Sequence, residues 1–153
     1  MGLKPSHIDS HEGALFFDPN IFKIYIDLAV ENDLLAFVPI EASMHFNSGL
    51  DKPSNAVIID QFHMLHGGTK VEDIKNFYFN VIENLKPGLS QIIIHLGKDE
   101  PVLKKITVDH PNFDHRWRQK DHDIVNSKEF KNLLVEHDVK LISWFDLKNV
   151  ILR

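Results

Sequence analysis

Three side chains that could bind a metal ion lie close together near the start of the sequence. His7, Asp9 and His11 occur in the stretch KPSHIDSHEG, where they alternate with other residues. Alternate side chains of an extended strand point to the same face. At about 3.3 Å per residue, however, His7 and His11 would lie roughly 13 Å apart, whereas a zinc–nitrogen bond is about 2.0 to 2.1 Å long. We therefore expect one histidine to bind a metal, with Asp9 beside it or orienting it, unless the strand ends and curls.

The alternative interpretation of this stretch needs no metal. Asp9 and Ser10 are residue types that cap turns, and the histidines beside them would then be solvated. The alternating pattern alone does not decide between a ligand segment and a capped turn.

His95 is a second candidate, because it follows the apolar run Ile92-Ile93-Ile94 and precedes a glycine. A run that is apolar on both faces is typical of a parallel strand covered by helices. The carboxyl end of such a strand is where α/β folds build their sites. A histidine hydrogen-bonded at a strand end, without a catalytic role, is the alternative. His63 and His66 have helical spacing, but the two glycines after them favour a helix end or a turn over a metal site.

Residues 109–123, DHPNFDHRWRQKDHD, combine histidines, aspartates and arginines around Trp117. Such a segment could face a sugar, with the indole as an aromatic platform and the charged groups as hydrogen-bonding partners. It could equally be a solvated charged surface.

Composition excludes several classes of protein. The 153 residues, 43% of them hydrophobic, fit one domain with a core. A net charge of −5 with scattered basic residues argues against a nucleic-acid partner. Without cysteine there is neither a disulfide framework nor a thiolate metal site, which fits a cytoplasmic protein. We expect no membrane role, since no apolar run is long enough to span a bilayer. The motifs of serine hydrolases and phosphate-binding loops are also absent.

The predicted elements alternate between strands and helices. Strands are expected over 6–10, 34–39, 56–60, 89–95 and 139–145, and amphipathic helices over 19–32, 71–85 and 127–138. Two segments, 41–55 and 96–126, fit no regular element, apart from a short helix near Val102 to Ile106. This order indicates a single α/β domain with parallel strands, either open or rolled toward a barrel.

Several of these pieces together resemble the YdjC-like carbohydrate deacetylases, which include the chitooligosaccharide deacetylases. Lys4 to His11 match the family's K-P-T-H-x-D-S-H segment, with Ser6 in place of threonine. Ile93-Ile94-His95 match a strand that ends in His-Pro, with Leu96 in place of proline. The later matches are Arg118, Asp121, Ser127 and the stretch LISWFDL. Their order agrees with the family over nearly the whole chain.

The resemblance implies a hydrolase that removes acetyl groups from amino sugars or oligosaccharides with a divalent metal, zinc or magnesium. In such an enzyme a metal-bound water attacks the acetamide carbonyl. His11 matches the family's metal-binding histidine. His95 matches the histidine of the His-Pro motif, which would act as the general acid. Asp9, His7 and Arg118 would surround the metal or position the substrate.

Two departures from the family limit this implication. The family's Asp-Asp-Phe-Gly-like segment and a further metal-binding histidine have no match here. We therefore expect a partial (β/α) barrel that lacks the family's N-terminal half and is inactive alone. The alternatives are a non-catalytic sugar-binding or interaction module, or a subunit completed by another chain. A partial barrel leaves strand edges unpaired, which favours a homo-oligomer.

Overall fold

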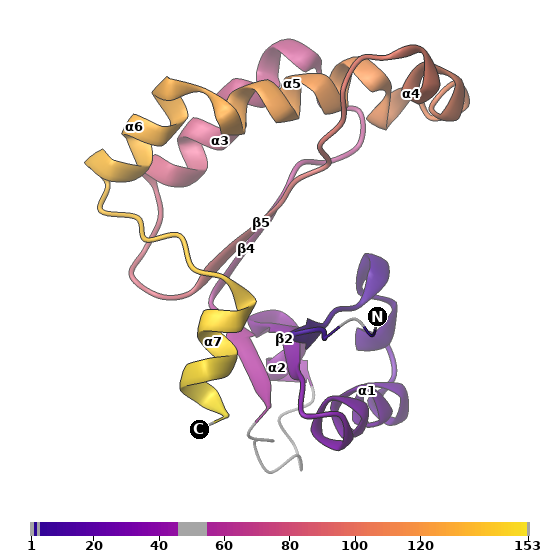
Figure 1. The fold of residues 1–153 in the computed structure, drawn as a ribbon, viewed down its shortest axis with the longest axis vertical. Helices are drawn as coiled ribbons and strands as arrows, with labels where there is room; N and C mark the ends of the chain where they lie inside the picture. Colours follow the sequence, from indigo (N-terminus) through magenta and orange to yellow (C-terminus); the bar gives the residue numbers. More distant parts are fainter. Residues whose placement is uncertain (1, 3, 46–54, 153) are drawn as a thin grey trace. The chain divides into compact units, whose positions relative to one another are not determined.

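The computed structural model describes Gly2 and residues 4–45 and 55–152. The chain forms two compact units (Figure 1). Unit 1 comprises residues 1–61 and 141–153, and unit 2 comprises residues 62–140. No helix in the described part of the chain is long and apolar enough to cross a membrane. The single-domain interpretation of the sequence stays a prediction.

Unit 1 contains a three-stranded parallel sheet of order β1-β2-β3. Its elements are β1 (His7–Ile8), η1 (His11–Phe16), α1 (Pro19–Glu31), β2 (Leu35–Pro39), α2 (Ile40–His45), β3 (Ala56–Ile59) and α7 (Trp144–Ile151). His7 pairs with Leu35, and Ala36 pairs with Ala56. Helix α7 therefore belongs to the same unit as β1, although the two lie at opposite ends of the described sequence.

Helix α1 confirms the helix predicted over 19–32. Asp18 begins it, because its carboxylate accepts hydrogen bonds from the backbone N–H groups of Asn20 (2.8 Å) and Ile21 (3.1 Å). Pro19 fits the first turn, where no backbone donor is needed. The buried side chains of α1 pack with those of β2 in the core of unit 1. This core consists of Phe22, Tyr25, Ile26, Ala29, Ala36, Val38 and Ala42.

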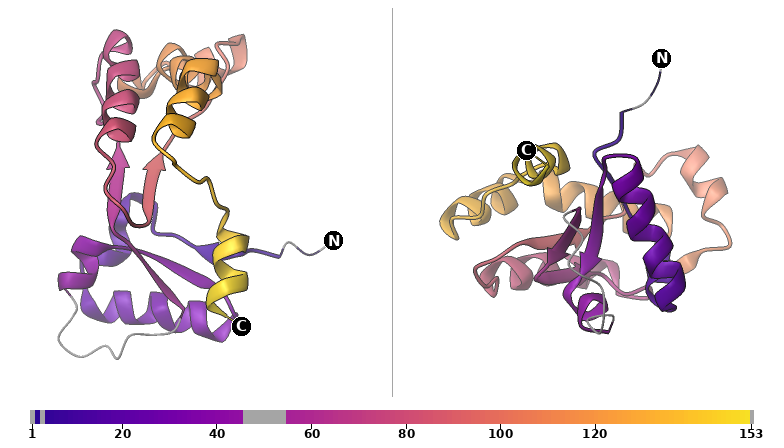
Figure 2. Two further views of the ribbon diagram at one scale, coloured as in Figure 1. Left: turned by 90° about the vertical axis from the view of Figure 1, so that its left-hand side faces the viewer. Right: turned by 90° about the horizontal axis from the view of Figure 1, so that it is seen from below.

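Unit 2 consists mainly of helices beside a two-stranded sheet. Apart from Gln61, the first residue of β4, which belongs to unit 1, its elements are β4 (Gln61–Met64), η2 (Val71–Asp73), α3 (Ile74–Glu83), β5 (Ser90–Ile93), α4 (Pro101–Ile106), η3 (Pro111–Phe113), α5 (His115–Asn126) and α6 (Lys128–Glu136). Strands β4 and β5 pair, and their arrows point the same way in Figure 2. The core of this unit is separate from that of unit 1 and is formed by Leu65, Ile74, Tyr78, Ile82, Trp117, Ile124, Phe130, Leu133 and Leu134.

The mixed α/β class with parallel strands is confirmed. Within the described residues the strands form two separate sheets and do not close into a barrel. The partial barrel and the missing N-terminal half stay predictions. The helices predicted over 71–85 and 127–138 are confirmed by η2 with α3 and by α6, which Ser127 caps by accepting from Phe130 N–H at 3.1 Å.

Two segments differ from expectation. The strand predicted over 139–145 is wrong, because Ser143 and Asp146 form a reciprocal capping box that begins α7 at Trp144. Residues 96–126 contain the twelve-residue helix α5, where only a short helix near Val102 to Ile106 was expected. That short helix is confirmed by α4. In addition, the segment 41–55 begins within helix α2, where no regular element was expected, and its residues 46–54 lie outside the described part of the chain.

Candidate functional site

Strand β1 is shorter than the predicted strand, and the chain turns directly after it. Strand β1 stops at Ile8, and the chain enters η1 at His11. Asp9 Oδ1 accepts from Ser10 N–H at 2.6 Å, and the buried Ser10 hydroxyl accepts from Leu15 N–H at 2.9 Å. Both bonds are local, as in the turn-capping interpretation of Asp9 and Ser10. His7, Asp9 and His11 therefore do not line one face of a continuous strand.

His7 is held by packing within unit 1. Its ring stacks on Trp144 with 4.2 Å between ring centroids and 8° between ring planes. Its Nδ1 lies 3.0 Å from the Ser6 hydroxyl oxygen. Burial lowers the pKa of His7, and the negative charge of Asp9 opposes that shift only in part. The imidazole is consequently favoured in its neutral form and serves as an aromatic partner for α7.

Tyr25 holds the sheet beside this segment. Its hydroxyl lies 2.8 Å from the carbonyl oxygen of Ile8 and 2.9 Å from that of Phe37. Burial raises the pKa of Tyr25, with the charge of Asp9 adding to the shift, so the hydroxyl keeps its proton and remains a donor. The end of β1 is thereby fixed to β2 through α1.

His11 is exposed at the start of η1. Among the described residues, no group of three or more histidine, aspartate or glutamate side chains is arranged to hold a metal ion. One carboxylate oxygen of Asp9 is already engaged by Ser10. The described side chains therefore do not fit a zinc or magnesium site by themselves, and the role of His11 as a metal ligand stays a prediction.

The segment after β5 places His95 in a different setting. Its backbone N–H donates to Oδ2 of Asp121 at 2.6 Å. Its ring contacts those of Phe113 and Trp117, with centroid distances of 5.2 and 5.8 Å. The ring Nδ1 is buried and has no hydrogen-bond partner among the residues that the structure describes. A desolvated imidazole with an unused nitrogen is typical of a group available for proton transfer.

Charges around His95 act on its protonation in opposite directions. Burial lowers the pKa of His95, the Arg118 guanidinium lowers it further, and the Asp121 carboxylate raises it. The net shift is downward. The ring is thus favoured as neutral imidazole, which must take up a proton before it can act as the predicted acid.

Arg118 lies beside His95 but is engaged with the backbone. Its Nε donates to the carbonyl oxygen of Phe113 at 3.0 Å, and its own carbonyl oxygen accepts from Gly97 N–H at 3.2 Å. A Cβ on Gly97 would lie 2.6 Å from a methyl carbon of Leu103 and 3.1 Å from the Cβ of Arg118, so a larger residue here would require the Leu103 side chain to move. The structure brings His95 and Arg118 together in unit 2, whereas His7, Asp9 and His11 belong to unit 1.

Trp117 is not the aromatic platform that one interpretation of residues 109–123 required. Its side chain is only 2% exposed, and its indole N–H donates to the carbonyl oxygen of Thr69 at 3.2 Å. Trp117 lies on the buried face of α5 together with Asp121 and Ile124, at the spacing of one helix face. The indole therefore belongs to the core of unit 2.

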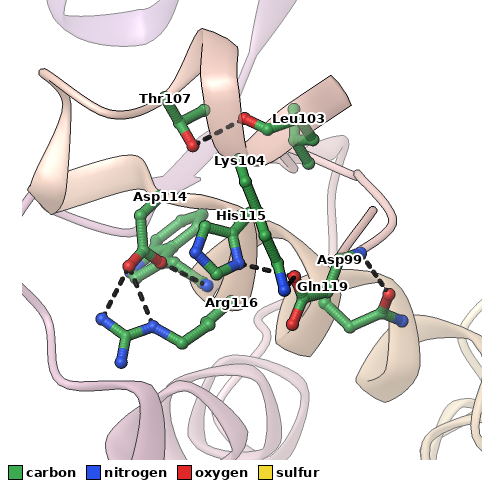
Figure 3. Close-up of polar contacts among 9 residues, drawn as sticks. Asp99, Leu103, Lys104, Thr107, Asp114, His115, Arg116 and Gln119 are labelled. Atoms are coloured by element: carbon green, nitrogen blue, oxygen red, sulfur yellow. Dashed lines mark hydrogen bonds and ion pairs between the residues drawn. The ribbon is translucent and has the colours of Figure 1, made fainter. Parts of the chain in front are cut away.

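The charged side chains of this segment join α4 to α5, as Figure 3 shows. Asp99 lies 2.6 Å from His115 Nδ1 and 3.1 Å from Lys104 Nζ. The hydrogen bond from Lys104 is the main reason why the pKa of Asp99 is lowered. Asp114 begins α5 by accepting from Trp117 N–H at 2.9 Å and also binds Arg116 at 2.8 Å. Although burial opposes the shift, these bonds lower the pKa of Asp114. These contacts are structural.

Comparison with known proteins decides the family. The model of the YdjC-like proteins matches residues 1–136. The chain belongs to the YdjC-like family. The resemblance inferred from the sequence is thus confirmed.

One solved structure shows the same fold as this YdjC-like chain. It is a proposed cellobiose-phosphate cleavage protein from Enterococcus faecalis V583, with a TM-score of 0.70 and 16% sequence identity. The match covers 95% of this chain and 54% of the other, so this chain spans about half the length of that structure. A comparison with curated proteins gives no match.

Two residues near His95 were missed as site residues from the sequence. Asp121 entered the resemblance only as a matching acid, and Tyr78 only as part of an apolar helix face. Both are fully buried in unit 2 and hydrogen-bonded to each other. The signal that could have revealed Asp121 is its position on the same face as Trp117 and Ile124, at i, i+4 and i+7.

Proposed function

We propose that this chain is part of a metal-dependent carbohydrate deacetylase that hydrolyses N-acetyl groups of amino sugars or chitooligosaccharides. Membership of the YdjC-like family supports the carbohydrate class. The observation that carries the reaction type is His95, a partly buried imidazole just after β5 whose Nδ1 has no hydrogen-bond partner among the described residues and whose ring is acted on by the charges of Arg118 and Asp121. At 16% identity the solved neighbour supports the fold and not a substrate.

The reaction requires water oxygen to add to the acetamide carbonyl carbon and the carbon–nitrogen bond to break. The products are acetate and a free amine, which must receive a proton as it leaves. His95 suits that transfer, because its lowered pKa keeps the ring neutral until a proton arrives from the attacking water. Because the described residues do not form a ligand group for a metal, we assign no step to the metal, and its zinc or magnesium identity remains part of the proposal. A cytoplasmic location is likewise proposed only.

Acetate release from N-acetylglucosamine oligomers tests this function. The purified chain, His95→Gln and His11→Gln would be assayed with added zinc or magnesium, and oligomer binding would be measured by titration calorimetry. We expect oligomer binding by all three proteins. Because the described residues form no ligand group for a metal, acetate release by the isolated chain should lie well below the roughly 1 s⁻¹ at the low end of typical enzymes. Any release that is detected should depend on the added metal and be lost in both variants.

A second candidate function follows from the partial coverage of the neighbour and the incomplete ligand set. The chain would be a sugar-binding or interaction module, or a subunit completed by another polypeptide. Oligomer binding without metal-dependent acetate release would favour this candidate, and no oligomer binding would contradict both. Release at 1 s⁻¹ or faster would show instead that the chain is complete. Light scattering adds the oligomeric state, and a monomer would count against a homo-oligomer.

A further inference from the structure

Asp121 is a buried carboxylate that joins three parts of unit 2. It lies in α5 and is 0% exposed. Its Oδ1 accepts from the hydroxyl of Tyr78 in α3, and its Oδ2 accepts from the backbone N–H of His95 after β5. Both carboxylate oxygens therefore have hydrogen-bond partners, of which the Tyr78 hydroxyl is fully buried and the His95 N–H partly buried. A group buried in this way is costly unless each bond is satisfied, so its position is strongly constrained.

The segment that begins at His95 is attached to α5 at alternate residues. Gly97 N–H donates to the Arg118 carbonyl oxygen at 3.2 Å, and Asp99 N–H donates to the Gln119 side-chain oxygen at 2.8 Å. Together with the bond from His95, these contacts hold residues 95–99 along α5. The bond to Asp121 is the first of the three and lies at the residue whose ring faces the aromatic core.

The ring of His95 has no polar restraint of its own at Nδ1. Phe113 and Trp117 contact the ring, and that nitrogen is buried without a partner. The ring orientation consequently depends on packing and on where the backbone of His95 is held. Of the charged groups that act on this ring, Arg118 disfavours its protonated form and Asp121 favours it.

We propose that Asp121 is a positioning residue for His95, which fixes the backbone from which the imidazole projects and presents a negative charge to the ring. The reaction that His95 serves rests on the proposed function, whereas the positioning itself does not. The other carboxylate oxygen, Oδ1, does not contact His95, because it accepts from the Tyr78 hydroxyl. Burial, together with this bond, raises the pKa of Tyr78, which keeps the hydroxyl protonated.

Two variants separate the acceptor from the charge. Asp121→Ala removes both, and Asp121→Asn retains an oxygen acceptor while removing the charge. Each would be studied in the full chain by NMR, with hydrogen exchange at the His95 amide and titration of the His95 imidazole as readouts. Tyr78→Phe is the matched control, because it deletes the other hydrogen bond and leaves the carboxylate beside His95.

The expected results differ between the variants. Asp121→Ala should speed hydrogen exchange at the His95 amide, because the bond from that amide is lost. The increase in rate should be at least about tenfold larger than the increase at core amides of α3, which report the loss of overall stability. Asp121→Asn should leave that exchange near the wild-type rate and lower the imidazole pKa. Arg118→Gln should raise the imidazole pKa, and Tyr78→Phe should leave it close to wild type.

The proposal would be overturned if the imidazole pKa of His95 were the same in Asp121→Asn as in the wild type. It would also be overturned if exchange of the His95 amide in Asp121→Ala increased no more than exchange of the α3 core amides. If Asp121→Ala does not fold, the wild-type protein decides the geometry through scalar coupling across the bond between His95 N–H and the Asp121 carboxyl group. Detecting that coupling supports the proposal, and its absence contradicts it. None of these readouts needs catalysis, so the outcome of the acetate-release and oligomer-binding assays bears on the proposed function and leaves the positioning of His95 to be decided by NMR.

Discussion

The histidine segments of the two units are held in different ways. In unit 1, His7 stacks on Trp144 and its Nδ1 lies beside the Ser6 hydroxyl. In unit 2, His95 is fixed through its backbone by a buried carboxylate, and its ring retains a nitrogen without a partner. Burial lowers the pKa of both histidines. Both rings also make aromatic contacts. What differs is Nδ1, which has a hydrogen-bond partner in His7 and, among the described residues, none in His95.

This difference separates ligand-rich sequence from a chemically available group. The segment from His7 to His11 has the denser pattern of metal-binding residue types, but its contacts secure a turn and the attachment of α7. The segment around His95 has a single histidine, and its Nδ1 has no hydrogen-bond partner among the described residues, which favours the proposed role in proton transfer. Substitutions in the two segments should therefore differ in how strongly they change the stability of their unit and the protonation of its histidine.

The largest effect is expected when the anchor of His95 is removed. Asp121→Ala leaves the Tyr78 hydroxyl and the His95 N–H buried without an acceptor. We expect unit 2 to lose about 2 to 5 kcal/mol of stability, measured by hydrogen exchange of its core amides in increasing urea. Asp109→Ala is the control, because this exposed aspartate lies in the same unit and should change stability by no more than about 0.5 kcal/mol. Equal effects of the two substitutions would remove the distinction between the segments.

Sequence patterns predicted those elements that combine apolar spacing with a local cap. The helices at α1 and α6 have both signals, since Asp18 and Ser127 cap amphipathic stretches. Helix α5 was missed because its sequence is mostly polar, although Asp114 caps it. The segment 139–145 was assigned to a strand because its apolar run outweighed the capping pair of Ser143 and Asp146.

The candidate site was predictable by residue type but not by environment. His95 was identified because an apolar strand precedes it. That Asp121 lies buried beside His95 depends on the packing of α5 in unit 2, and local residue patterns do not specify such packing. The stack of His7 on Trp144 joins residues from opposite ends of the described chain, and local patterns contain no information on such a contact.

A smaller effect is expected when the stack in unit 1 is broken. Trp144 contacts both His7 and Phe37, with centroid distances of 4.2 and 6.3 Å, and its side chain is partly exposed. Trp144→Ala should therefore destabilise unit 1 by about 2 to 3 kcal/mol, at or below the low end for buried tryptophan. Hydrogen exchange of the β2 amides in urea measures this change.

Phe145→Ala is the matched control for Trp144→Ala, because the neighbouring ring is 54% exposed and should contribute at most about 0.5 kcal/mol. An equally small effect of Trp144→Ala would mean that the stack does not hold α7. His7 would then be as available as His95, and the contrast between the two segments would fail.

The smallest effect concerns the titration of His7. Because burial lowers the pKa of His7 in the folded protein below 6.5, the unfolded chain binds the proton first as the pH falls. The stability that this residue contributes is complete above about pH 6.5 and decreases below it, until the pH reaches the folded-state value. His7→Phe keeps an aromatic ring beside Trp144 and removes the titrating group. Urea unfolding of unit 1 at pH 8 and pH 5.5 should therefore show a smaller loss in the variant than in the wild type. The same loss in both proteins would place the titrating group elsewhere and leave His7 as a purely aromatic contact.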